Sequence, residues 1–237
     1  MDLPSLRRET RYGMPAADHI LFNRHYVLGY SYFFRQAKWA LEIIDSTHEV
    51  VERSDNFRPD YRIPEMFRVD LQDYSNSGHD RGHLVASADQ RSVKLQNSET
   101  FLLSNMSPQK PNFNRQMWKK LEEAVRALNG KEKIFETYVI CGPIFYFDKP
   151  VEFIGQGDSN EVAVPIPNAF FKSILTENDK GAINMWSFIL PNKRADKPLE
   201  DYRVPTTKVE QYAGIQLWAR LEGSKIISEK KRVRKMW

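Results

Sequence analysis

One strongly periodic helix, in a chain otherwise made of short apolar runs, is the sequence feature that most limits the fold. Five apolar side chains between residues 115 and 128 fall on one helical face at about 100° per residue: Met117, Leu121, Ala124, Val125 and Leu128. Asn129-Gly130 then gives a stop signal. Strand candidates follow at 134–141, 144–147, 161–164, 169–175 and 183–190, separated by Pro, Gly and Asn/Asp clusters. Because strands and helices are interleaved, the sequence predicts an α+β fold with a central antiparallel sheet flanked by helices, rather than a parallel α/β sheet.

The N-terminal part of the chain contains one clear hairpin signal. Residues 25–34 and 39–44 are rich in Tyr, Phe, Val and Ile, and the polar step Arg35-Gln36-Ala37-Lys38 between them predicts the turn. Residues 1–20 are polar and broken by Pro and Gly, which predicts an N-terminal arm lying on the body. Residues 45–78 are irregular and predict a surface loop.

Three further segments complete the predicted order. Residues 92–103 predict a short helix running into a strand, and residues 209–221 predict a late helix. Residues 222–237 form a basic C-terminal tail, and its cationic run 230–235 fits either a solvated tail or a nucleic-acid arm. No internal repeat or low-complexity linker divides the chain, so we expect a single domain over 1–237.

Composition limits the classes of protein to which the chain can belong. A formal net charge of +4 allows a polyanionic partner without requiring one. The single cysteine, Cys141, excludes an intramolecular disulfide and a Cys-rich zinc site, and its apolar surroundings predict a buried side chain. No apolar run approaches the roughly 18–20 residues of a membrane span, so no membrane partner is expected. Residues 1–8 show no signal-peptide core, although a leader could have been removed, so the compartment stays open.

The residues suited to chemistry begin with His79-Asp80-Arg81-Gly82-His83-Leu84, followed by Ser104-Asn105-Met106-Ser107-Pro108-Gln109. A lone histidine is usually a satisfied polar residue, but the neighbours of His83 favour a reactive one. A neutral imidazole, with an ordinary pKa near ~6.5, can take a proton from water. Arg81 offers a permanently charged fork that matches phosphate oxygens, and Gly82 permits a sharp turn or a close approach.

Asparagine side chains supply the second element of the pattern. Asn105 lies in the second motif, and Asn114 stands where a helix N-cap belongs, before Arg115 and Gln116. A carboxamide oxygen is also a hard ligand of the kind that Mg²⁺ accepts, and Mg²⁺ keeps most of its waters and needs few protein ligands. For Asn114 the cap and the metal ligand are therefore both open interpretations.

The helix itself carries the third element. From Asn114, the residues Trp118, Glu122 and Arg126 follow at intervals of four and form a stripe beside the apolar face. Glu122 and Arg126 fit a plain surface ion pair worth about 0.3–0.5 kcal/mol. They equally fit a working pair, in which Glu122 accepts hydrogen bonds from metal-bound water and Arg126 grips a phosphate. Spacing alone does not decide between the two.

These motifs together resemble the signature of the DNA/RNA non-specific endonucleases, the ββα-metal or His-Me finger family that includes the Serratia nuclease, cyanobacterial NucA-type enzymes and mitochondrial endonuclease G. The resemblance is carried by Asp80–His83, Ser104–Gln109, Asn114, Trp118, Leu121 and Glu122. Five further segments look endonuclease G-like: Tyr12–Pro15, Tyr26–Leu28, Val139–Pro143, Glu161–Pro165 and Phe170–Lys172. The resemblance covers most of the chain and implies a ββα-metal motif within the α+β fold.

The resemblance implies a role for each residue of the motif. His83 is the expected general base, and Asn114 is the expected direct protein ligand of a single Mg²⁺, for which Mn²⁺ can substitute. Glu122 is expected to act beside the metal by holding its waters. Asp80 and Gly82 are expected to be structural, and His79 is given no role.

The remaining site residues implied by the resemblance act on phosphate. Arg81 and Asn105 are expected to support the scissile phosphate and orient the site, and Arg126 is expected to make a further phosphate contact. Arg53 is the best match to the remaining phosphate-binding arginine of the family, although this alignment runs through a variable loop. Two other arginines of that loop could serve instead: Arg58 and Arg62.

The activity implied by the resemblance is hydrolysis of DNA and RNA with little sequence preference, leaving 5′-phosphate and 3′-hydroxyl ends. Relatives are secreted, periplasmic or mitochondrial, and they are often homodimers. An inhibitor protein is a further possible partner.

Two other classes of function are weighed against this one. A non-catalytic module that binds nucleic acid or a partner protein should show damage to its His, Asn and Glu set, and none is damaged here. A two-metal phosphodiesterase should show clusters of His and Asp ligands, whereas this chain has only 5 histidines, widely dispersed apart from His79 and His83.

Overall fold

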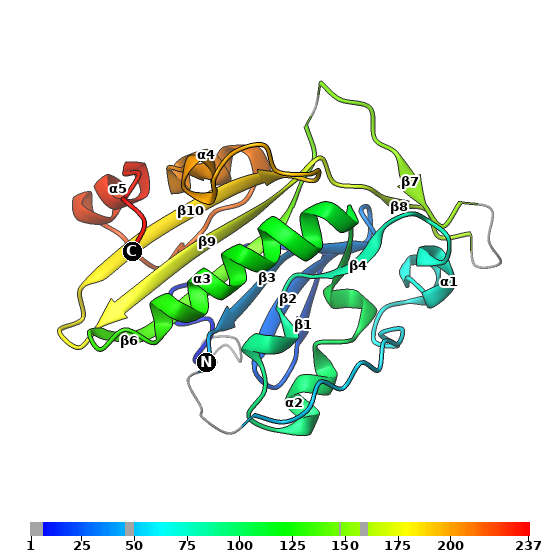
Figure 1. The fold of residues 1–237 in the computed structure, drawn as a ribbon, viewed down its shortest axis with the longest axis horizontal. Helices are drawn as coiled ribbons and strands as arrows, with labels where there is room; N and C mark the ends of the chain where they lie inside the picture. The colour runs from blue at the N-terminus through cyan, green and yellow to red at the C-terminus, as the bar shows by residue number, and fades with distance from the viewer. Residues whose placement is uncertain (1–6, 46–49, 147, 157–160) are drawn as a thin grey trace.

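A seven-stranded sheet with the strand order β1-β2-β3-β6-β9-β10-β11 forms the centre of the computed structural model, which describes residues 7–45, 50–146, 148–156 and 161–237 (Figure 1). The strands are β1 (His19–Phe22), β2 (Tyr26–Ser31), β3 (Gln36–Ile43), β6 (Ile134–Ile144), β9 (Ala169–Asn178), β10 (Ile183–Pro191) and β11 (Arg203–Val204). Every neighbouring pair is antiparallel. The predicted α+β class is therefore confirmed.

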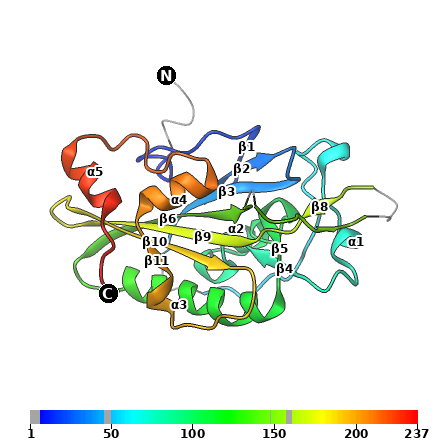
Figure 2. The same ribbon diagram turned by 90° about the horizontal axis from the view of Figure 1, so that it is seen from above.

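Helices cover both faces of this sheet. Helix α3 (Lys119–Asn129) lies on one face, and α4 (Thr206–Ala213) and α5 (Ser224–Lys231) lie on the other (Figure 2). Alternate strand residues point to opposite faces. Ala40, Val139 and Cys141 therefore join the core under α3, while their neighbours Leu41 and Ile140 join the core under α4.

A smaller two-stranded sheet connects this scaffold to the motif residues. Strand β4 (Asp80–His83) pairs antiparallel with β5 (Met106–Gln109), and the helix that ends as α3 follows directly. A Cβ at Gly82 would lie 2.2 Å from the buried side-chain amide of Gln109, so glycine is needed at this position of the paired strands. Trp118 donates its indole Nε1–H to the carbonyl of His83 at 3.2 Å, which fixes the helix against β4. This strand–strand–helix unit is the predicted ββα motif.

The predicted helix is present but begins earlier than expected. Its first turns, Phe113–Trp118, are π-helical, and regular α-helix starts at Lys119. Asn114 lies inside the wide turn and is not an N-cap, so the capping interpretation is wrong. Single wide turns of this kind are often found at functional sites.

Several predicted boundaries shift for identifiable reasons. The hairpin of β2 and β3 is confirmed, but its turn lies at residues 32–35 because Gln36 already pairs with Ser31. The separate strand predicted at 144–147 is wrong for residues 144–146, since β6 continues through Gly142-Pro143 to Ile144 and residues 145 and 146 are not in a strand, while residue 147 lies outside the described residues. The late helix stops at Ala213 because Gly214 takes the left-handed φ of 62°.

The remaining predicted segments agree in part with the structure. In 92–103 the helix is α2 (Lys94–Glu99), but the strand begins only at β5. The candidate at 161–164 reduces to β8 (Val164–Pro165), paired with β7 (Phe153–Ile154). The 45–78 loop holds a short helix, α1 (Leu71–Tyr74), and its residues 46–49 lie outside the described residues, as do residues 1–6 of the predicted arm. Helix α2 follows the 3-10 turn at Ser87–Asp89.

The basic tail is folded and not extended into solvent. Residues 224–231 form α5, and Trp237 returns to α3, where its Nε1–H donates to the carbonyl of Ala124 at 2.9 Å. Met236 and Trp237 pack against the core beneath α3, whereas Lys231, Arg232 and Lys235 of the cationic run are exposed, so the solvated interpretation fits these charged side chains but not the end of the chain.

Candidate active site

A cavity of about 410 Å³ lies where β4, the segment after it and the N-terminal half of the helix meet. Its lining residues are Arg53, Arg81, His83, Ala86, Ser87, Ala88, Asn114, Arg115, Lys119, Glu122 and Arg126. Six residues predicted for catalysis, metal binding or phosphate binding are in this set: Arg53, Arg81, His83, Asn114, Glu122 and Arg126. Five cationic side chains against one carboxylate make the cavity suited to an anionic ligand.

The imidazole of His83 is held by aromatic rings at the end of β4. Phe57 lies 5.6 Å and Phe101 5.0 Å from its ring centroid, both edge-on. Its Nε2 has no hydrogen-bond partner within the described part of the chain. Burial, with a smaller contribution from the charge of Arg53, lowers the pKa of His83 to about 3. The imidazole is therefore neutral at physiological pH, which is the form that can accept a proton.

Asn114 is oriented by a carboxylate on β4. Its Nδ2 donates to Asp80 Oδ2 at 2.9 Å, and Arg115 donates to both oxygens of the same carboxylate at 2.9 and 2.7 Å. Burial opposes ionisation of Asp80, but the bonds from Arg115 and Asn114 outweigh it and hold the pKa of Asp80 below its usual value. Because Asp80 takes the amide nitrogen, the Oδ1 end of Asn114 is left for a ligand in the cavity.

Glu122 lies two turns further along the helix and faces the same cavity. Burial raises the pKa of Glu122 to about 7, while the positive charge of Lys172 acts in the opposite direction. Lys172 on β9 is 1% exposed, and its Nζ lies 4.5 Å from the centroid of the Trp118 ring. The carboxyl of Glu122 is therefore poised between its two protonation states near neutral pH.

The arginines of the cavity are each held by a neighbour. Arg126 donates to Asp89 at 2.6 Å, so of the two open interpretations of Glu122 and Arg126 the plain surface ion pair is wrong. Arg53 donates to Ser87 Oγ at 3.1 Å and its guanidinium lies 4.8 Å from the Phe101 ring centroid. The alternatives to Arg53 are used elsewhere, Arg58 by backbone carbonyls and Arg62 by Asp60.

Arg81 completes the cationic wall. Its guanidinium lies 4.3 Å from the centroid of the Phe57 ring, and its side chain is exposed to the cavity. Stacking on a ring fixes the plane of the guanidinium while leaving its N–H groups available to an anion.

Asn105 does not reach the cavity. It is fully buried, its Oδ1 accepts from the backbone N–H of Val85, and its Nδ2 donates to the carbonyls of Val85 and Thr100. The expectation that Asn105 orients the site fits these contacts. The expectation that it supports the phosphate directly does not, because both amide protons and the oxygen are already used.

The oxygen donors of the cavity fit a hydrated hard cation better than a metal held by a protein cage. In the described ranges, no group of three or more His, Cys, Asp or Glu side chains could hold a metal ion. One oriented carboxamide oxygen with a carboxylate beyond it matches the needs of Mg²⁺, which keeps several waters and takes few protein ligands.

Comparison with known proteins agrees with this geometry. The family model described as DNA/RNA non-specific endonuclease matches residues 5–224. The mitochondrial endonuclease G of Caenorhabditis elegans is 34% identical over 233 residues, covering 92% of this chain and 74% of that protein. A nuclease of Syncephalastrum racemosum is 36% identical over 231 residues, covering 89% of this chain and 70% of that protein.

The chain belongs to the DNA/RNA non-specific endonuclease family. Human mitochondrial endonuclease G is 30% identical over 213 residues, with 86% of this chain and 71% of that protein covered. A crystal structure of the EndoG/EndoGI complex, described as showing the mechanism of EndoG inhibition, matches with a TM-score of 0.81 at 33% identity and covers 91% of both chains. The protein is thus a hydrolytic nuclease by family.

Sequence reasoning missed several residues of the nuclease cavity. Ser87, Arg115 and Lys119 line it, and Phe57 and Phe101 hold the imidazole. Lys119 could have been found from the helical stripe, since it lies three residues before Glu122 and so shares its face. The two phenylalanines carried no signal, because their contact with His83 joins segments distant in sequence.

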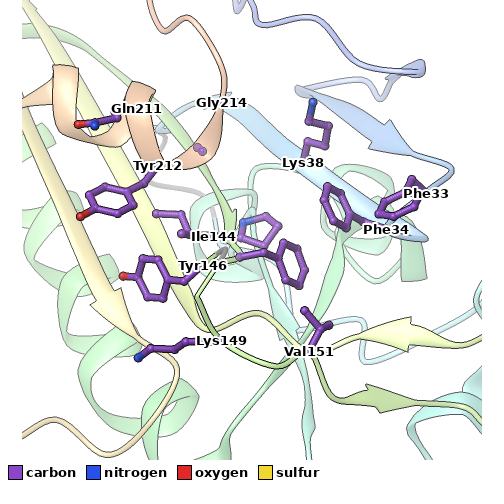
Figure 3. A pocket seen from close by; sticks show the side chains of 13 residues that line it. Phe33, Phe34, Lys38, Ile144, Tyr146, Lys149, Val151, Gln211, Tyr212 and Gly214 are labelled. Atoms are coloured by element: carbon purple, nitrogen blue, oxygen red, sulfur yellow. The ribbon is translucent and has the colours of Figure 1, made fainter.

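A second cavity of about 440 Å³ lies on the other side of the sheet, near α4 (Figure 3). It is lined mainly by aromatic and apolar side chains, among them Phe33, Phe34, Phe145, Tyr146 and Tyr212. Phe34 and Phe145 stack at 4.6 Å with their planes 9° apart. Among the residues that the structure describes, its lining contains neither a histidine nor a carboxylate.

Proposed function

We propose that this nuclease is a Mg²⁺-dependent enzyme that hydrolyses DNA and RNA with little sequence preference and leaves 5′-phosphate and 3′-hydroxyl ends. The observation that carries the proposal is the joint placement of an uncharged imidazole, His83, and an oriented carboxamide, Asn114, in one cation-lined cavity. Neither group alone would be diagnostic.

His83 acts in this proposal as the general base. It removes a proton from the water that attacks phosphorus, and the aromatic rings of Phe57 and Phe101 hold the imidazole in position for that transfer. Since water is the nucleophile, the ribose 2′-hydroxyl is not consumed. One site can therefore cut both RNA and DNA.

Asn114 would hold the Mg²⁺ ion through its carboxamide oxygen, and Glu122 would accept hydrogen bonds from the waters of the ion. When bound, the ion supplies Lewis-acid stabilisation of the leaving oxygen, an effect worth several kcal/mol. Asp80 keeps the carboxamide turned toward the cavity. Mn²⁺, which accepts the same ligands, is expected to substitute.

Arginines of the cavity supply charge for the phosphate. Arg81, Arg53 and Arg126 are fixed by a ring or by a hydrogen bond before substrate arrives. Such preorganised donors stabilise developing charge without a reorganisation cost. Contacts limited to phosphate and sugar carry no sequence code, which accounts for the low specificity.

Partners and compartment are proposed from the relatives. A structural neighbour of this chain was solved as the EndoG/EndoGI complex, and we therefore propose that a protein inhibitor also binds this nuclease and blocks the mouth of its cavity.

We also propose a homodimer. The aromatic cavity near α4, where Phe33 is 80% exposed, is the surface best suited to a second copy. Light scattering of the intact protein tests the dimer.

The named mitochondrial relatives favour a mitochondrial location, with a secreted or periplasmic location as the alternative. Within the described residues, no helix is long and apolar enough to cross a membrane.

The test is digestion of plasmid DNA and ribosomal RNA by the wild type and by a His83→Ala variant, with Mg²⁺ or with EDTA. We expect cleavage of both polymers only by the wild type with Mg²⁺, and binding of nucleic acid by both proteins. His25→Ala, at an exposed histidine, is the matched control. Wild-type turnover by His83→Ala, or full activity in EDTA, would contradict the proposal. Binding without any cleavage would favour the non-catalytic module instead.

A further inference from the structure

Lys119 lies at the mouth of the candidate catalytic cavity and contributes little to the stability of the fold. It is the first residue of α3, it lines the cavity, and its side chain is 64% exposed. The helical period places it on the same flank of the helix as Glu122 and Arg126, beside the groups assigned to the reaction.

The one ion pair of Lys119 in the described part of the chain is a weak one. It is made with Glu123, at 3.8 Å, between two largely exposed side chains. Exposed pairs of this kind contribute little, and the order Lys before Glu at i,i+4 is the less favourable one. The ammonium group can therefore leave Glu123 for an anion at almost no cost.

Three of the other four cations of the cavity are held by hydrogen bonds, and the fourth, Arg81, stacks on Phe57. Arg115 is bidentate on Asp80, Arg126 is paired with the buried Asp89, and Arg53 bonds Ser87. Lys119 differs from these in its contacts, since within the described residues its ammonium group meets only the exposed Glu123, at 3.8 Å.

Distance along the helix separates Lys119 from the phosphate contact expected at Arg126. The two residues are seven positions apart, which is about 10 Å at 1.5 Å per residue. That spacing allows the two side chains to contact successive phosphates of one strand. The cavity also carries more positive charge than a single phosphodiester neutralises.

We propose that Lys119 binds a second phosphate of the nucleic-acid strand, one that flanks the scissile phosphate. The inference rests on the proposed nuclease function and deepens it, since it makes the preferred substrate a polynucleotide that extends beyond the cleaved bond. Lys119 is a binding residue in this assignment and takes no part in the chemical step.

The experiment compares Lys119→Gln with Lys120→Gln, both made in the His83→Ala protein so that the probe is not cut. Lys120 is the next residue, is equally a helix-surface lysine, and does not line the cavity, so it matches the charge change. The probe is a fluorescein-labelled 20-base-pair DNA, and its dissociation constant is measured by anisotropy from 50 to 300 mM KCl.

We expect the slope of log affinity against log salt concentration to become less negative by about 0.9 for Lys119→Gln, the value for one phosphate contact on duplex DNA. We expect the affinity at 50 mM KCl to fall several-fold. We expect Lys120→Gln to keep the slope of its parent. An unchanged slope for Lys119→Gln, or equal changes in both variants, would overturn the proposal.

A failure of the proposed nuclease function is detected by a separate measurement. The wild-type protein, which retains His83, would then show no cleavage, whatever salt dependence the variants show. In the wild-type background, Lys119→Gln should raise KM for long DNA several-fold and leave kcat unchanged, since only binding is lost. A fall in kcat with KM unchanged would place Lys119 in the chemical step and overturn the assignment.

Discussion

The side-chain nitrogen of Asn114 donates to Asp80 Oδ2 at 2.9 Å, and this bond decides which end of the carboxamide faces the cavity. Asp80 is itself fixed by both donors of Arg115. The first residue of the Asp-Arg-Gly-His motif therefore acts on the helix, by orienting the residue proposed to hold the metal. Outer partners of this kind orient metal ligands in many proteins.

Replacing Asp80 with Ala should weaken Mg²⁺ binding by about 10–100-fold, because the carboxamide of Asn114 loses its orienting acceptor. Activity should return in part at high Mg²⁺. Asp80→Asn keeps an acceptor oxygen and should be milder. Calorimetric titration with Mg²⁺ in the absence of nucleic acid measures the effect directly. Equal Mg²⁺ affinity of wild type and Asp80→Ala would show that the bond does not orient the ligand.

His83 should make the fold sensitive to acid. Its pKa is lowered to about 3 in the folded protein from an ordinary 6.5, so the unfolded chain takes up a proton that the folded one refuses. The stability that this group contributes is present above pH 6.5 and is lost as the pH falls toward 3. Because His83 in the unfolded chain is already half protonated at pH 6.5, His83→Gln should lose about 1.6 kcal/mol less stability than the wild type between pH 6.5 and 5. Urea unfolding at the two pH values measures this, with His25→Gln as the control. Parallel losses in wild type and His83→Gln would contradict the prediction.

Local patterns in the sequence predicted the parts of the fold that local forces determine. The apolar spacing of the helix and the β2–β3 hairpin depend on side chains close in sequence, and both are present. The π-helical turn at Phe113–Trp118 could not be read this way, because it accompanies contacts of Asn114 and Trp118 with β4, more than thirty residues earlier.

Site residues followed the same division. Arg81 and His83 of the Asp-Arg-Gly-His motif line the cavity, as predicted from the sequence. The aromatic rings around His83 and the buried contacts of Asn105 could not be predicted, because they join distant segments. The sequence does not indicate that Lys172, in the middle of β9, is buried. Its burial is tolerated because Glu42 and Asp89, from other segments, supply opposite charge.

Mg²⁺ binding should release a proton from Glu122 below neutral pH. Burial raises the pKa of Glu122 to about 7, so the carboxyl is largely protonated at pH 6 and is a weaker acceptor for metal-bound water than the carboxylate. Apparent Mg²⁺ affinity should rise with pH up to about 7 and then level off. Calorimetry at pH 6 in two buffers of different ionisation enthalpy measures the released proton. Glu122→Gln should abolish the release and Glu123→Gln, at an exposed neighbour, should not. The prediction fails if affinity is independent of pH from 5.5 to 8.

Lys172 should be needed for stability as well as for the shape of the site. Burial opposes its charge, but Cys141, Glu122, Glu42 and Asp89 outweigh it and raise the pKa of Lys172, so the amine stays ionised. Lys172→Met leaves buried carboxyls without their cation, and we expect a loss of about 3–5 kcal/mol. The loss should be greater at pH 8 than at pH 5, where the carboxyls, whose pKa values are raised, can take protons. Denaturant unfolding tests this against exposed Lys120→Met, which should change stability by less than about 0.5 kcal/mol.

Trp237 should hold the catalytic helix from the flank opposite the cavity. Its Nε1–H donates to the carbonyl of Ala124 at 2.9 Å, and its ring meets that of Trp186 edge-on at 5.4 Å. Ala124 lies about 160–200° around the helix from Glu122 and Arg126, so this contact fixes α3 without entering the site. Because the ring is only partly buried, Trp237→Ala should cost about 2 kcal/mol, less than the 3–5 kcal/mol typical of a fully buried aromatic. Hydrogen exchange should quicken along α3, and Val233→Ala, at an exposed position in the same segment, should leave both measurements unchanged. If Trp237→Ala unfolds at the same denaturant concentration as Val233→Ala, with α3 equally protected, the C-terminal segment is only resting on the helix.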